Sequence, residues 1–306
     1  MKKPKLSSIL ITALFILGFF SVARVLSEIM HPAGDGGFPV LHTVSAVIWF
    51  VLIWLVSRLR RRANAPEIPP SELASALQKT IGLPYKLLPD QVPPDTLLRF
   101  FKRTLKEAGE QGFSPILVPA DPIMKERLEA KRRNDGAEPK DGALSVPEDG
   151  KAILERRWNT VLAQHPELND PFDAADGNEV FQFESCRDGE TGKPKETLLL
   201  RVPTEQPWQV AAFLPFGGWD ALPDNGEILA VCKYWYETYR AVPAVFTYNA
   251  MEFLLPKTIS REDAVKVARE HAAFCPGLLA QDDATGSIGK LADSLWKSNI
   301  WYFQWD

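Results

Sequence analysis

Two long apolar runs without charge, residues 6–23 and 38–57, dominate the start of the hydrophobic pattern. Each is long enough to cross a hydrocarbon core of roughly 30 Å as a helix, which satisfies its own backbone hydrogen bonds. Basic residues precede the first run and follow the second, and short basic segments stay in the cytoplasm. The pattern therefore predicts a transmembrane hairpin with helices at about 6–27 and 38–57, and with both of its ends in the cytoplasm.

A cleavable signal peptide is the alternative interpretation of the first run. It has a basic start, an apolar stretch and small residues at Ser21 to Ala23, a plausible cleavage site. The second run would then still cross inward, so both interpretations predict that the C-terminal part is cytoplasmic.

Beyond a proline-bearing linker at 63–70, helical and strand periods follow one another without strict alternation, which predicts a mixed α/β (α+β) domain. We expect an N-terminal part of this domain at 71–200 and a C-terminal domain at 201–306. The helical segments are 71–80, 95–108, 121–133, 151–164, 227–240, 260–275 and 287–297. The strand segments are 116–119, 180–184, 197–202, 208–213, 242–247, 251–255 and 300–306.

Charge narrows the range of partners. The chain holds 35 Lys plus Arg and 39 Asp plus Glu, and the basic excess of the first 62 residues leaves the remainder acidic. An acidic surface disfavours nucleic acid and favours a protein partner with a basic surface. Three cysteines without paired spacing, Cys186, Cys232 and Cys275, indicate reduced thiols.

Four motifs give the last hundred residues a more specific character. They lie at 216–220, 230–239, 268–276 and 301–306. In order and spacing they resemble the bacterial domain-of-unknown-function family numbered 4253, over about Trp208 to Asp306. The resemblance implies a fold unit without an established activity. With the predicted hairpin, it implies a multi-pass protein of the bacterial inner membrane.

The helix 260–275 carries the most reactive side chains. His271 and Cys275 are four residues apart and so project from one side of the helix, where such a pair can bind zinc or form a thiol–base couple. A metal would need further ligands, and Cys232 is the only attractive one. A buried structural pair is the alternative, because small residues share this face. We therefore expect no metal and no cofactor.

A ligand pocket is predicted where aromatic residues meet carboxylates. Trp219 and Asp220 follow two glycines that allow close backbone approach, and the terminal strand places Trp301, Phe303 and Trp305 on one side. The candidate residues are Trp219, Asp220, Trp235, Tyr239, Glu270, His271, Trp305 and Asp306.

The absence of specific catalytic motifs favours a membrane-anchored protein with a cytoplasmic binding module, of an accessory or immunity type that docks a partner. The first alternative is a membrane-tethered enzyme that uses Asp220, Glu270, His271 or Cys275. In a second alternative, the hairpin itself joins a larger membrane complex.

Overall fold

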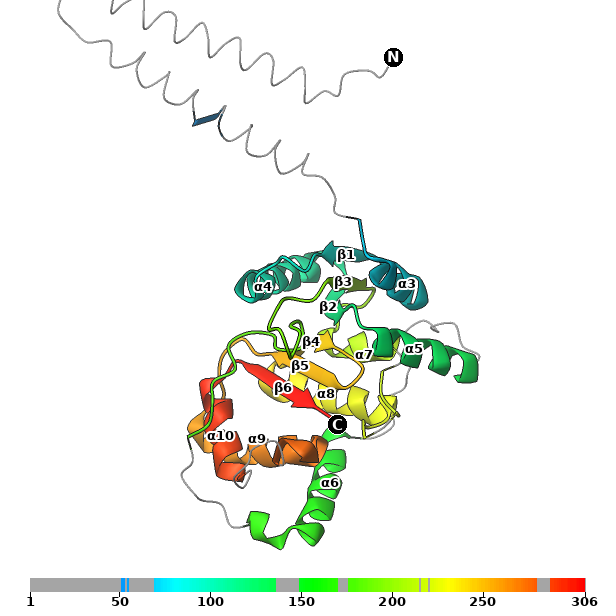
Figure 1. The fold of residues 1–306 in the computed structure, drawn as a ribbon. Helices are drawn as coiled ribbons and strands as arrows, with labels where there is room; N and C mark the ends of the chain where they lie inside the picture. Colours follow the sequence, from blue (N-terminus) through cyan, green and yellow to red (C-terminus); the bar gives the residue numbers. More distant parts are fainter. Residues whose placement is uncertain are drawn as a thin grey trace, which may run out of the picture. The chain divides into compact units, whose positions relative to one another are not determined.

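The computed structural model describes most of the chain after the apolar N-terminal segment. The described residues are 51–52, 54, 69–135, 149–169, 176–214, 216–219, 221–279 and 287–305. The chain divides into two compact units, Met1–Pro69 and Pro70–Asp306. The helices and strands below all belong to the second unit (Figure 1).

The predicted transmembrane hairpin, and the fold class that included it, are corrected by the structure. No helix in the described part of the chain is both long enough and apolar enough to cross a membrane. Even α4 (Pro94–Gln111), with 18 residues, carries charged side chains along its exposed face. Of the hairpin, only Val51, Leu52 and Trp54 are described; its other residues lie outside the described part. The predicted membrane contact and the multi-pass inner-membrane localisation depended on the hairpin and are corrected with it.

A mixed sheet forms the centre of the second unit, in the strand order β1-β3-β2-β4-β5-β6. The β2–β4 pair is parallel and the other neighbouring pairs are antiparallel. The strands are β1 (Tyr85–Leu88), β2 (Ser114–Pro119), β3 (Thr197–Val202), β4 (Val242–Phe246), β5 (Ala250–Leu254) and β6 (Ile300–Gln304). The fold is therefore mixed α/β, as the pattern predicts.

Helices cover both faces of this sheet, and several begin at a side chain that caps them. In α3, α6, α8, α9 and α10 the residue before the helix is Ser or Asp, whose oxygen accepts a backbone N–H of the first turn. The remaining helix bounds are α3 (Glu72–Ile81), α5 (Pro122–Asp135), α6 (Gly150–Gln164), α7 (Val210–Phe213), α8 (Asn225–Tyr239), α9 (Arg261–Phe274) and α10 (Ile288–Lys297).

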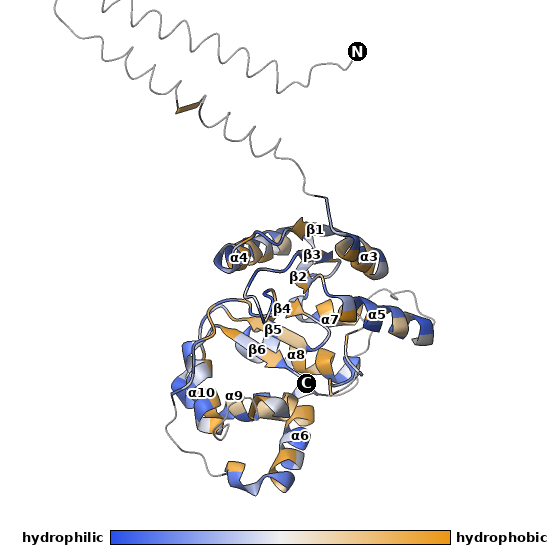
Figure 2. Cartoon of the chain, viewed as in Figure 1, coloured by the Kyte–Doolittle hydropathy of each residue, from blue (hydrophilic) through white to orange (hydrophobic). Residues whose placement is uncertain are grey.

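The core has two layers because neighbouring strand residues point to opposite faces. Ile116 and Val118 of β2 belong to the larger cluster, with α8 and α9, whereas Leu117 belongs to the cluster beneath α4. Phe183 completes the second cluster by packing edge-on against Phe101 of α4, with ring centroids 5.6 Å apart. The strands β4 and β5 are mainly hydrophobic (Figure 2). Each face of the sheet is thus buried.

Two of the predicted strands are wrong. Residues 180–184 form no strand, because the N–H groups of Glu184 and Ser185 donate to the Glu252 carboxylate instead of to a strand partner. Residues 208–213 fall in a 3₁₀ turn and α7, after Pro207. The strand β1 was not predicted. The boundary expected between residues 200 and 201 falls inside β3.

Candidate functional site

Glu270 of α9 is the centre of the most unusual polar cluster. Its side chain lies against the aromatic face of α8 and the residue is only 8 % exposed. The hydroxyl of Tyr234 donates to Oε1 at 2.9 Å, and Nε1 of Trp235 donates to Oε2 at 3.0 Å. The Tyr239 hydroxyl donates to Oε1 at 3.4 Å. One carboxylate therefore joins three side chains of α8 to α9.

The α8 sequence explains this convergence. Trp235 and Tyr239 are four residues apart and so lie on one side of the helix, with Tyr234 next to them. The helix ends at Tyr239, and the N–H of Arg240, the next residue, donates to the Tyr236 carbonyl at 3.0 Å.

Burial controls the ionisation of the cluster. Desolvation raises the pKa of the Glu270 carboxyl, while the hydrogen bonds from Tyr234 and Trp235 and the charge of Lys266 act in the opposite direction. Lys266 Nζ lies 3.8 Å from Oε1. Burial first, and then the negative charge of Glu270, raise the pKa of Tyr234 and of Tyr239. Both phenols therefore remain protonated and able to donate.

His271 faces the interior, surrounded by rings. Its ring centroid lies 4.6 Å from that of Trp301, 4.5 Å from that of Phe303 and 5.2 Å from that of Trp235. Burial lowers the pKa of His271 well below its usual value, so the ring is neutral. Its Nε2 has no hydrogen-bond partner among the described residues.

The cysteines are also enclosed. Cys275 Sγ donates to the Gln304 carbonyl at 3.1 Å, and all three cysteines are buried. Burial raises the pKa of Cys232 and is the main reason that the pKa of Cys186 is raised. Nowhere among the described residues do three or more His, Cys, Asp or Glu side chains gather as a metal site requires.

The other predicted pocket residues lie apart from Glu270 or outside the described chain. Trp219 donates from Nε1 to the Tyr248 carbonyl at 2.7 Å and so anchors a turn. Trp305 stacks on Phe303, with ring centroids 6.1 Å apart, and packs edge-on against Phe274. Asp220 and Asp306 are outside the described residues. The structure thus brings together Trp235, Tyr239, Glu270 and His271, but not Trp219.

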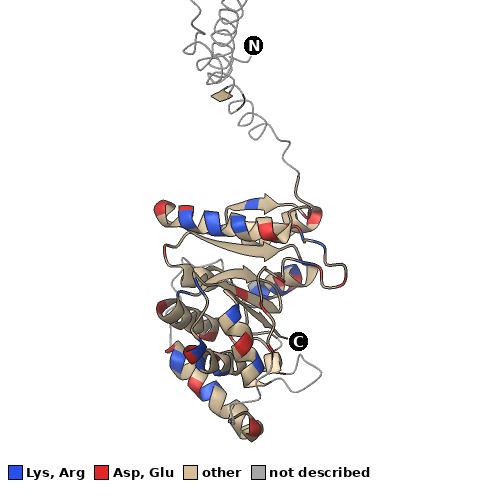
Figure 3. Cartoon of the chain, turned by 90° about the vertical axis from the view of Figure 1, so that its left-hand side faces the viewer, with Lys and Arg blue, Asp and Glu red and all other residues tan. Residues whose placement is uncertain are grey.

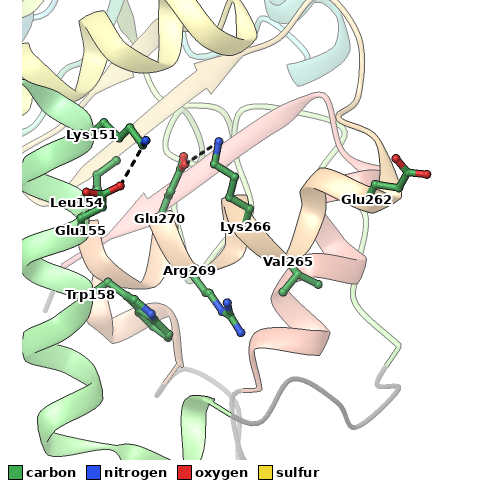
Figure 4. Close-up of a pocket in the computed structure, with 9 residues that line it drawn as sticks. All are labelled: Lys151, Leu154, Glu155, Trp158, Glu262, Val265, Lys266, Arg269 and Glu270. Atoms are coloured by element: carbon green, nitrogen blue, oxygen red, sulfur yellow. Dashed lines mark ion pairs between the residues drawn. The ribbon is translucent and has the colours of Figure 1, made fainter.

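A cavity of about 410 Å³ opens beside Glu270, between α6 and α9. Figure 4 shows its lining: Lys151, Leu154, Glu155 and Trp158 from α6, and Glu262, Val265, Lys266, Arg269 and Glu270 from α9. Lys151 Nζ lies 3.5 Å from Glu155 Oε1, which pairs two of these charges within α6. The α6 side of the cavity was not predicted.

Arg269 is the third cation in the described lining of this cavity, beside Lys151 and Lys266. Its guanidinium carbon lies 6.0 Å from the ring centroid of Trp158, within the range of a cation–π contact. It forms no ion pair with another described residue, and its buried Nε lacks a hydrogen-bond partner among them. The cavity therefore presents an available guanidinium beside an aromatic face.

Gly150 sets the position of α6. A Cβ at this residue would lie 2.2 Å from the Ala230 carbonyl oxygen and 2.9 Å from Tyr234 Cβ. Only glycine allows the helix to start so close to α8. The ion pair of Arg157 with Glu227, at 2.5 Å, holds the same two helices together. The pocket thus depends on a close contact that hydrophobic periodicity does not reveal.

Comparisons with known proteins find a family match for the C-terminal part of the chain. No curated protein matches it, and no solved structure does. A family model does match, and it covers β5, β6, α8 and α9, whose rings pack around Trp235. It confirms the resemblance seen in the four sequence motifs. Residues 198–306 match the family described as Domain of unknown function (DUF4253).

Proposed function

We propose that this protein is a binding module, and that the cavity between α6 and α9 binds a small organic anion with a flat apolar part. The observation that carries the proposal is Arg269, a cation without an ion-pair partner among the described residues, next to the ring of Trp158. A guanidinium binds a carboxylate or phosphate through paired hydrogen bonds, and an aromatic face accommodates a flat group.

The state of the reactive groups favours binding over catalysis. His271 is neutral and enclosed by rings, and the thiols of Cys232 and Cys275 are buried. A nucleophile or a general base needs access to its substrate. By contrast, Arg269 and Trp158 line an open cavity.

An enzyme remains the second candidate, because Glu270 lines the same cavity and burial raises the pKa of its carboxyl. A carboxyl with a raised pKa can act as a general acid or base. The hydrogen bonds that Glu270 accepts from Tyr234, Trp235 and Tyr239 would have to break first. The enzyme proposal also predicts a reactive Cys275, so a thiol reagent that modifies Cys275 in the folded protein would favour it over the binding module.

Titration of the full chain with benzoate and with benzamide tests the binding proposal, because the two probes share a ring and differ in charge. We expect saturable benzoate binding, with benzamide at least about tenfold weaker. Arg269→Gln should remove that preference. Arg261→Gln is the matched control, since Arg261 lies on the same helix over a different ring, that of Trp296, at 4.2 Å. Equal binding of the two probes, or equal losses in both variants, would contradict the proposal.

A further inference from the structure

A second, larger cavity lies at the C-terminal end of α8, at one end of the sheet. Its volume is about 610 Å³, within the range of small-molecule sites. It is bounded by α4, the start of β2, the last turn of α8 and the end of β5. In the part of the chain that the structure describes, it shares no lining residue with the cavity beside Arg269. It is therefore a separate candidate site.

The walls of this cavity are mainly hydrocarbon. Leu105 and Ala108 of α4, Val242 and Leu254 of the sheet, and the ring of Phe113 all line it. These surfaces favour an apolar ligand body, since burying it removes hydrocarbon from water on both sides.

Two cations line the same cavity. Lys102 of α4 and Arg240 at the end of α8 are both exposed, and neither forms an ion pair with another described residue. Figure 3 shows that α4 carries both basic and acidic residues on its outer side. The two arginines of α4, by contrast, are paired: Arg99 with Asp95, and Arg103 with Glu107. Glu205 is the single carboxylate among the described residues of the lining, so positive charge prevails there.

Arg240 has an unusual backbone. Its φ is 59°, and it is the only non-glycine residue with positive φ in the described part of the chain. Glycine is the usual residue at this position after a helix, because it adopts the left-handed conformation without strain. The guanidinium lies 5.3 Å from the ring centroid of Tyr236, another lining residue. A strained arginine at a cavity suggests that its side chain has a role there.

We propose that this cavity binds an anionic amphiphile, a hydrocarbon chain with one carboxylate head. The hydrocarbon packs between α4 on one side and the start of β4 and the end of β5 on the other. Arg240 and Lys102 bind the carboxylate by charge-assisted hydrogen bonds. The proposal depends on charge complementarity and on the apolar walls, and it is independent of the function proposed for the other cavity.

Calorimetric titration of the full chain with dodecanoate, dodecanol and dodecylammonium tests the head-group chemistry with one hydrocarbon tail. We expect saturable binding of one dodecanoate per chain, with dodecanol weaker and dodecylammonium at least about tenfold weaker. Equal affinity for the anionic and cationic probes, or binding without saturation, would overturn the proposal.

Variants locate the site. Arg240→Gly should weaken dodecanoate binding about tenfold or more while the urea midpoint stays equal or rises, since glycine relieves the strain. Unchanged binding by this folded variant would overturn the assignment. Lys102→Gln should also weaken binding, whereas Arg103→Gln, one residue away and paired with Glu107, should not. Loss of dodecanoate binding in Arg269→Gln would place the ligand in the other cavity and refute the proposal.

Discussion

Glu270 shows how a single carboxylate can connect two helices. It accepts hydrogen bonds from Tyr234, Trp235 and Tyr239 while only 8 % of the residue is exposed. Hydrogen bonds to a charged group are stronger than those between neutral groups. At the residue scale, this carboxylate is therefore both a part of the cavity lining and a structural link between α8 and α9.

Glu270→Gln should destabilise the protein by about 1–3 kcal/mol, because an amide nitrogen replaces one acceptor and faces a donor. Urea unfolding of the full chain measures this change. Glu262→Gln is the control, since Glu262 lies on the same helix and is exposed. A Glu270→Gln variant as stable as the parent would show that the three hydrogen bonds contribute little.

A second buried carboxylate, Glu252 of β5, connects the sheet to the segment across its other face. It is fully buried and accepts the N–H groups of Ser185 at 2.7 Å and Glu184 at 3.1 Å. Burial raises the pKa of Glu252 to about 7, although the hydrogen bonds from Ser185 and Glu184 lower it. The unfolded chain ionises this carboxyl near its ordinary value of 4.5.

The contribution of Glu252 to the free energy of unfolding should therefore fall as the pH rises from about 4.5 to 7. In this window the folded state holds a proton that the unfolded state has released, an effect of up to about 3 kcal/mol. His271 contributes with the opposite sign. Because its pKa is lowered in the folded state, a fall in pH favours the unfolded state, which binds the proton more readily. Comparison with Glu252→Gln isolates the contribution of the Glu252 carboxyl, since the glutamine side chain does not titrate.

Urea unfolding across this pH range should show the Glu252 contribution as the difference between parent and variant. Glu190→Gln, an exposed change on the nearby segment, is the matched control. Parallel profiles for the parent and Glu252→Gln would mean that Glu252 has the same pKa in the folded and unfolded states.

At the scale of elements, the position of α6 decides whether the cavity beside Arg269 exists. Gly150→Ala should cost about 1–3 kcal/mol and shift α6, because the new Cβ would overlap the Ala230 carbonyl. Gly109→Ala is the matched control in α4, where a Cβ would meet no other described segment within 4 Å, and it should be neutral or slightly stabilising. Thermal unfolding and benzoate titration measure both effects. Retained stability and retained benzoate binding in Gly150→Ala would contradict this account.

Local periodicity predicted most elements of the C-terminal part. The two strands around Tyr248 and the helices that follow Ser260 and Ser287 agree with the structure because alternation and caps are local signals. Residues 180–184 were wrongly predicted as a strand because a side chain distant in sequence, Glu252, binds their backbone. A pattern along the chain cannot show that partner.

The candidate site was predictable only in part, for the same reason. Helical spacing suggested that Trp235 and Tyr239 share a face, and the structure brings both to Glu270. Trp158 and Arg269 were missed. Their proximity depends on how α6 packs against α9, which is a tertiary contact.

At the scale of the whole second unit, the sheet connects segments far apart in sequence. The family match begins at residue 198, inside β3. In the sheet, β3 lies between β1 and β2, and β4 has β2 as a neighbour. The matched segment alone would therefore leave both edges of β3 and one edge of β4 without partners. It would also lack α6, which packs against α8 and α9.

Residues 70–306 should consequently fold as one cooperative unit, whereas residues 198–306 alone should not, because unpaired strand edges and an uncovered apolar face promote aggregation. Amide NMR dispersion and urea unfolding distinguish the two outcomes. Mixing the fragments 70–197 and 198–306 is the control, since β1, β2 and α6 supplied in trans should restore a dispersed spectrum. Cooperative unfolding of 198–306 by itself would mean that the family segment is an independent domain. The pairing of β3 with β1 and β2 would then contribute less to stability than the hydrogen bonds between these strands imply.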